Sequence, residues 1–156
     1  MPSTRSSRGD PRRARSRAGG QSAAPSVTAA RFLGMWRLVA LEGDSSRGPH
    51  PTGFIMYDDS GHMAVQVIPD TPRRRFSRDA APTPEEAQVA LTGYTAYFGR
   101  YTIDEKLGTV THHREGSVDP GALGDVVRRY QFPEDDHLIL MPVESQEIRL
   151  VWERLK

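Results

Sequence analysis

The chain has no cysteine among its 156 residues, which excludes a disulfide framework, a thiol nucleophile and a metal site built on thiolates. Long apolar runs are also missing, and no segment approaches the length of a membrane span. The first residues lack the apolar stretch that a secretory signal needs. We therefore expect a cytoplasmic protein without a membrane partner, and a length of 156 residues favours one folded domain.

Positive charge is scarce outside the first twenty residues. The formal net charge is +1, yet residues 1–20 carry six arginines against one aspartate, and the remainder carries 15 basic against 19 acidic residues. A mildly acidic body is not typical of a nucleic-acid-binding fold, so we expect no nucleic-acid partner.

The start of the chain holds almost no apolar side chains and cannot bury enough surface to become ordered. We predict a disordered Arg/Ser-rich arm over 1–28 and a folded domain over 29–156. Three interpretations of the arm stay open: a basic tail for nucleic-acid or membrane phosphates, a transit-like peptide, and an extension without a role. The last is favoured, because no aromatic residues are interleaved with the arginines.

Apolar and polar residues alternate in several short stretches, which is typical of β-strands. Asp58-Asp59-Ser60-Gly61 is a hairpin signal between two of them. Eight strands are predicted, over residues 32–42, 54–57, 62–68, 100–104, 109–115, 126–132, 138–141 and 147–154.

One helix is predicted after the third strand. Thr83 has the place of an N-cap, Pro84 that of the first helical residue, and Glu86 completes a capping box. We expect the helix to end at Gly99. Apolar side chains recur within it at helical spacing: Ala87, Ala90, Leu91, Tyr94 and Tyr97. Eight mostly short antiparallel strands predict an all-β, closed up-and-down barrel with room for one small ligand, and this helix could cap one mouth.

The residues also resemble a known family. Gly34-Met35-Trp36 is similar to the Gly-x-Trp signature of lipocalins, and Arg154 could pack across that tryptophan. Residues 32–154 resemble the bacterial and fungal lipocalin-like domain proteins. The matching segments are Leu33-Gly34-Met35-Trp36-Arg37-Leu38-Val39, Gly53-Phe54-Ile55-Met56-Tyr57 with Gly61-His62-Met63, residues 94–101, Val110-Thr111-His112-His113, Gly116-Ser117 with Pro120, Arg129, and Leu150-Val151-Trp152-Glu153-Arg154.

The resemblance implies an eight-stranded barrel around a hydrophobic small molecule. Lipocalin-type barrels of microbial secondary metabolism include cyclases that close rings on polyketide chains. Two departures concern the rim of the cavity. Arg73-Arg74-Arg75-Phe76 stands where the family tends to have Arg-Pro-x-Phe, and Gly121-Ala122-Leu123 follows Pro120 where a tryptophan is expected. No ligand is therefore transferred from a relative.

Three residues are candidates for catalysis: His112, Arg129 and Tyr101. His112 and His113 must face opposite sides of a strand, and we expect His112 inside, because it shares its face with Val110. It could act as a general acid or base or bind a ligand, or it could be a half-buried histidine satisfied by a neighbour. Arg129 could lie beside His112 and bind a carboxylate, enolate or carbonyl group, or it could face solvent.

Candidate ligand-binding residues are mostly aromatic: Tyr57, His62, Gln66, Tyr94, Tyr97 and Trp36. A tyrosine hydroxyl could donate a hydrogen bond to a ligand carbonyl. For Tyr94 and Tyr97 on the expected helix stripe, core packing is the favoured alternative. His62 and Gln66 share a strand face that could present both to the cavity. Trp36 and Trp152 are expected to plug the closed end of the barrel.

Motifs for metals, nucleotides and covalent catalysis are missing. There is no His-x-His or His-Glu-x-x-His spacing, no glycine-rich phosphate loop and no Gly-x-Ser-x-Gly elbow. We therefore expect neither a metal nor a cofactor. The predicted function is a cofactor-free, pericyclase-like cyclase or isomerase of polyketide metabolism that acts on a hydrophobic or amphipathic molecule. The alternative is a carrier without catalysis, and the protein could be a monomer or a homodimer.

Overall fold

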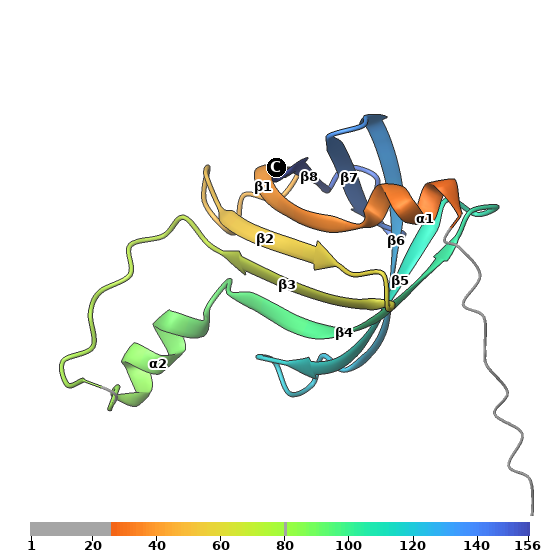
Figure 1. Cartoon of the computed structure of the whole chain (residues 1–156). Coiled ribbons are helices and arrows are strands. Elements are labelled where there is room, and N and C mark those ends of the chain that lie inside the picture. The colour runs from red at the N-terminus through yellow and green to blue at the C-terminus, as the bar shows by residue number, and fades with distance from the viewer. Residues whose placement is uncertain (1–25, 80) are drawn as a thin grey trace, which may run out of the picture.

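The computed structural model describes residues 26–79 and 81–156. Its eight strands pair antiparallel in chain order, and β8 pairs with β1 to close a barrel (Figure 1). This confirms the predicted architecture. The strands are β1 (Gly34–Glu42), β2 (Thr52–Tyr57), β3 (His62–Ile68), β4 (Thr95–Asp104), β5 (Thr109–Ser117), β6 (Gly124–Glu134), β7 (His137–Pro142) and β8 (Arg149–Arg154). Most of the arm predicted over 1–28 lies outside the described residues.

A short helix, α1 (Val27–Phe32), precedes the first strand. Ser26 is its N-cap and accepts a hydrogen bond from the backbone N–H of Ala29. Phe32, predicted to begin the first strand, is instead the last residue of this helix, so that prediction is wrong. Six residues are fewer than two helical turns, and so short a stretch gives no helical period to detect.

The second helix, α2 (Pro84–Leu91), lies between β3 and β4 as predicted, and the capping box of Thr83 and Glu86 is present. It ends well before the expected Gly99, so Tyr94 lies in a connecting segment and Tyr97 on β4. Tyr97 also fits a two-residue strand period with Gly99, Tyr101 and Ile103, and pairing with β3 and β5 decides between the two patterns.

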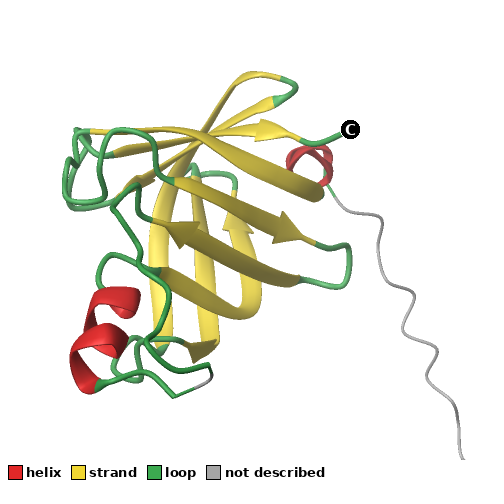
Figure 2. Ribbon diagram, turned by 90° about the vertical axis from the view of Figure 1, so that its left-hand side faces the viewer, coloured by secondary structure: helices red, strands yellow, loops and turns green. Residues whose placement is uncertain are grey.

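The position of α2 also differs from the prediction that it caps a mouth. Figure 2 shows it beside the barrel, at the end of a long loop. None of its residues is buried, and none lines the central cavity described below. No helix of the described residues is long and apolar enough to cross a membrane.

One end of the barrel is closed by α1 and the aromatic side chains beneath it; we call it the closed end. Phe32 is fully buried, and its ring meets those of Tyr57, Tyr130 and Phe132 edge to face at 5.0–5.2 Å. Such contacts join a helix to three inner strand positions. This packing closes the end of the barrel beneath α1.

Trp36 is the second part of this closure. It is fully buried, its Nε1 donates to the Phe32 carbonyl at 2.8 Å, and the Arg154 guanidinium lies 4.0 Å from the centre of its ring. Arg154 also donates to the carbonyls of Arg31 and Leu33. The expected packing of Arg154 across Trp36 is confirmed.

The loops β1–β2, β3–β4, β5–β6 and β7–β8 meet at the other end, which we call the open end. Gly43 has a φ of 74°, and any Cβ there would collide with the Glu147 carbonyl of the β7–β8 loop. Glycine is therefore needed for both its backbone conformation and the close approach. An ion pair of 3.3 Å between Arg149 and Glu42 joins the adjacent ends of β8 and β1.

Candidate functional site

A cavity of about 380 Å³ lies inside the barrel, within the size range of small-molecule sites. It reaches the open end, where residues of all four loops line it, including Asp44, Tyr94, Asp119 and Ile148. Its walls are apolar over much of their extent, with Val65, Val67, Leu140 and Leu150 among them.

A chain of three polar side chains crosses the interior. The hydroxyl of Tyr57 on β2 lies 2.8 Å from Nε2 of His112 on β5, and the hydroxyl of Tyr97 on β4 lies 2.9 Å from its Nδ1. Tyr57 and His112 are each 1% exposed. His112 and Tyr97 line the cavity, whereas Tyr57 stands behind them. His112 therefore faces inward, as the strand pattern predicted.

The environment keeps all three groups uncharged. Burial, with help from the positive charges of Arg128 and Arg114, lowers the pKa of His112 to about 3. Burial also raises the pKa of both Tyr57 and Tyr97. General acid–base catalysis works best with a pKa near the working pH, so this environment favours hydrogen bonding by His112 over proton transfer.

Of the neighbouring pair Arg128 and Arg129, Arg128 lines the cavity, so Arg129 as the candidate beside His112 has to be corrected. Arg128 pairs with Val110, which shares the inner face with His112, whereas Arg129 pairs with Thr109 and is exposed. Within the described part of the chain, the guanidinium of Arg128 has one hydrogen-bond acceptor, the carbonyl of its neighbour Val127 at 3.4 Å. A shift of one residue in strand register exchanges the inward and outward faces of β6, and the sequence does not show which register the strand adopts.

Arg114 and Arg47 also line the cavity, although neither was predicted from the sequence as a site residue. Arg114 donates to the carbonyls of Leu123 and Gly124, and its guanidinium lies 5.9 Å from the centre of the Tyr97 ring. Positive charge is thus gathered on the Tyr97 side of the cavity.

The prediction that His62 and Gln66 face the cavity is also wrong. Both are exposed, and the buried face of β3 is formed by Met63, Val65 and Val67. The ring of His62 instead contacts the Ser60 hydroxyl at 2.7 Å in the β2–β3 turn. This opposite face of β3 is more apolar than the face of His62 and Gln66, so the hydrophobic effect favours turning it towards the interior.

The remaining aromatic candidates are divided between the two ends. Tyr101 lies near the closed end, where its hydroxyl donates to the Asp58 carbonyl at 2.8 Å and its ring packs on Tyr57. Tyr94 lines the cavity at the open end, near the Arg73 guanidinium. Neither Tyr101 nor Trp36 belongs to the cavity lining.

Trp152 is the tryptophan that does line the cavity. Its side chain is buried, and its Nε1 has no hydrogen-bond partner in the described structure. The expectation that it only plugs the closed end therefore has to be revised. No pattern in the sequence separates Trp152 from Trp36, because both occupy inward positions of neighbouring strands.

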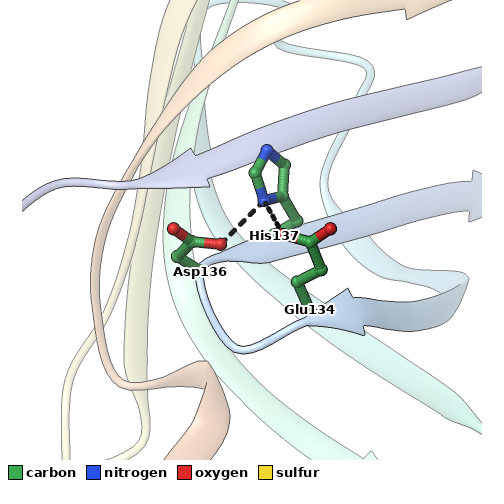
Figure 3. Close-up of side chains that lie close together, drawn as sticks. All are labelled: Glu134, Asp136 and His137. Carbon is green, nitrogen blue, oxygen red and sulfur yellow. Dashed lines mark hydrogen bonds and ion pairs between the residues drawn. The ribbon is translucent and has the colours of Figure 1, made fainter.

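The described residues hold one group of three side chains with the potential to ligate a metal, namely Glu134, Asp136 and His137 (Figure 3). Nδ1 of His137 lies 2.8 Å from Asp136 and 3.7 Å from Glu134. These residues belong to the β6–β7 turn and do not line the cavity. The β6–β7 hairpin and the hydrogen bond between His137 and Asp136 bring these side chains together, and the cavity does not depend on them.

Comparison with known proteins gives two results. A family model described as a lipocalin-like domain matches residues 33–155. Over 107 residues the chain is 31% identical to the 4'-hydroxy-3'-methoxypropiophenone carrier protein of Aspergillus oryzae, and this alignment covers 60% of the present chain and 96% of the fungal protein.

Proposed function

Because this chain belongs to the lipocalin-like domain family, we propose that it binds one hydrophobic or amphipathic small molecule inside the barrel and acts as its carrier. The observation that carries the proposal is the cavity of about 380 Å³ with its largely apolar walls. The fungal relative is named as the carrier of an aryl ketone, which supports a ligand of similar size and polarity here.

The natural ligand can be sought directly. The protein is purified from its own host, and native mass spectrometry is followed by solvent extraction. We expect a hydrophobic metabolite to co-purify in one copy per chain. If nothing co-purifies, and neither aryl ketones nor fatty acids bind to the purified protein, the proposal is rejected.

A cavity-filling variant tests where the ligand binds. Val65 is buried on the cavity wall, so we expect Val65→Phe to reduce the volume and weaken binding of 4'-hydroxy-3'-methoxypropiophenone at least about tenfold, equivalent to roughly 1.4 kcal/mol. Quenching of tryptophan fluorescence, to which Trp152 at the cavity wall contributes, measures the affinity.

The matched control is Val39→Phe, which adds the same ring to the exposed outer face of β1. It should bind the ketone as the wild type does. Equal affinity of the wild type and both variants would show that the ketone does not occupy the cavity.

A second candidate function is a cyclase or isomerase that needs no cofactor. It is favoured by Tyr97 and Arg128, whose polar groups line the same cavity as His112. Such donors could polarise a carbonyl group while the walls hold a flexible chain in a reactive shape. An isomerisation or ring closure moves bonds within one molecule, so this reaction requires no second reactant.

Turnover separates the two functions. The open-chain precursor of a co-purified cyclic metabolite is incubated with the wild type, Arg128→Met and Arg129→Met. A cyclase should lose about 100-fold or more of its rate in Arg128→Met and keep its rate in Arg129→Met, because Arg129 is exposed on the outer face. If the wild type is no faster than buffer, the cyclase function is rejected and the carrier function remains.

A further inference from the structure

The direction of the hydrogen bonds through His112 can be derived from the chemistry of its two partners. A neutral imidazole has one N–H donor and one acceptor nitrogen. His112 therefore donates to one of the two tyrosine hydroxyls and accepts from the other, across the contacts of 2.8 and 2.9 Å. The two possible arrangements differ in which tyrosine has a hydroxyl hydrogen that makes no hydrogen bond to His112.

Burial selects between these arrangements. Tyr57 is 1% exposed, is not part of the cavity wall, and has His112 as the hydrogen-bond partner of its hydroxyl. If Tyr57 accepted from Nε2–H, its own O–H would be buried without an acceptor, which is unfavourable. Tyr57 therefore donates to Nε2, and Nδ1–H donates to the oxygen of Tyr97. The O–H of Tyr97, which lines the cavity, remains available for a ligand.

A second observation on the cavity wall is independent of the first. The Nε1–H of Trp152 is buried and has no acceptor among the described residues, although an indole N–H can only donate. The Arg128 guanidinium is likewise a donor without acceptor capacity, and among the described residues no carboxylate lies within 4.0 Å of it.

The carboxylates that line the cavity, which could act as hydrogen-bond acceptors, lie at its entrance. Asp44 and Asp119 belong to the loops of the open end, and each accepts a backbone N–H within its own loop, from Ser46 and Gly121 respectively, at 2.9 Å. The interior is therefore rich in unused donors, whereas the acidic groups stand at the entrance. A ligand that only filled the apolar volume would leave the buried Nε1–H of Trp152 and the other donors of the wall without a partner.

We propose that the cavity selects a ligand whose buried end carries an oxygen acceptor, such as a ketone, carboxylate or phenolate, and that the Tyr97 hydroxyl donates to this oxygen. Arg128 and Trp152 supply further donors around it. Tyr57 and His112 are positioning residues, because they fix the direction in which the Tyr97 hydroxyl points. This inference rests on the proposed function and adds the chemical class of the ligand.

The test compares two probes of nearly the same shape, propiophenone with a carbonyl oxygen and propylbenzene without one. Their affinities are measured by isothermal titration calorimetry for the wild type, for Tyr97→Phe and for the control Tyr101→Phe, whose hydroxyl lies near the closed end. We expect Tyr97→Phe to weaken the binding of propiophenone about tenfold and to leave the affinity for propylbenzene unchanged. Tyr101→Phe should leave the affinities of both probes unchanged.

A spectroscopic measurement tests the positioning role. In ¹⁵N spectra of the histidine side chains, His112 of the wild type should carry its proton on Nδ1. Tyr57→Phe removes the donor to Nε2, so the proton should redistribute between the two nitrogens. A wild-type proton on Nε2 would overturn the derived direction.

The binding outcomes distinguish this inference from the function on which it rests. If both probes bind and Tyr97→Phe affects them equally, or affects neither, the acceptor requirement is wrong and small-molecule binding stands. If neither probe binds to the wild type, the proposed function itself fails for this class of ligand, and the inference fails with it.

Discussion

Replacing Trp36 with alanine is expected to lower the free energy of unfolding by about 3–5 kcal/mol, a large part of the stability of a typical domain. The indole is fully buried at the closed end. Its removal would leave a cavity under α1, the Phe32 carbonyl without its donor, and the Arg154 guanidinium without the ring beneath it. Urea denaturation followed by far-ultraviolet circular dichroism measures the effect.

Two further variants show where the stabilisation comes from. Trp36→Phe keeps a ring beneath Arg154 and loses the hydrogen bond, so we expect a smaller loss of about 1–3 kcal/mol. Met35→Ala truncates the preceding residue, which is on the outer face and 44% exposed, and should cost less than either. If Met35→Ala and Trp36→Ala were equally destabilising, the closed end would not depend on the buried indole.

The second large effect concerns acid. The free energy of unfolding should fall by roughly 2 kcal/mol between about pH 6.5 and pH 5, because the pKa of His112 is about 3 in the folded protein and 6.5 in the unfolded chain. In this range the unfolded chain takes up a proton that the folded protein excludes. The stabilisation is fully present above about pH 6.5 and is lost progressively as the pH falls towards the folded pKa.

The groups that face His112 explain why it resists protonation. Tyr57 and Tyr97 occupy both ring nitrogens, so a second ring proton would have to displace a hydrogen bond. Arg128 and Arg114 add electrostatic repulsion. Carboxylates such as Asp44 and Asp58, whose hydrogen bonds hold their pKa below its usual range, affect stability only at lower pH.

The control for the acid effect is the neighbouring histidine. Denaturation of His112→Asn should show a much flatter dependence between pH 6.5 and 5, whatever its overall stability. His113→Asn changes an outward side chain that contacts Asp125, and should retain the wild-type slope. If His112→Asn and the wild type had the same slope, the acid sensitivity would have to arise elsewhere.

Much of the fold could be predicted because its determinants are local. Alternating strands, the Asp58–Gly61 turn signal and the capping box at Thr83 are each readable over a few residues. The end of α2 was harder to predict, because Tyr94 and Tyr97 continue the helical spacing of the preceding residues, whereas Tyr97 also fits the two-residue period of Tyr101 and Ile103. Pairing of β4 with β3 and β5 then decided in favour of the strand.

The sequence alone determined the class of fold, the presence of an interior and the inward position of His112, since strand alternation and apolar patterning are encoded residue by residue. The tertiary structure decided that Arg128 rather than Arg129, and Trp152 rather than Trp36, lines the cavity. It also joined Tyr57 and Tyr97 to His112, across 55 and 15 residues of chain. The physical reason is that barrel closure and strand register fix which side chains meet across the interior, and neither is encoded within a single strand.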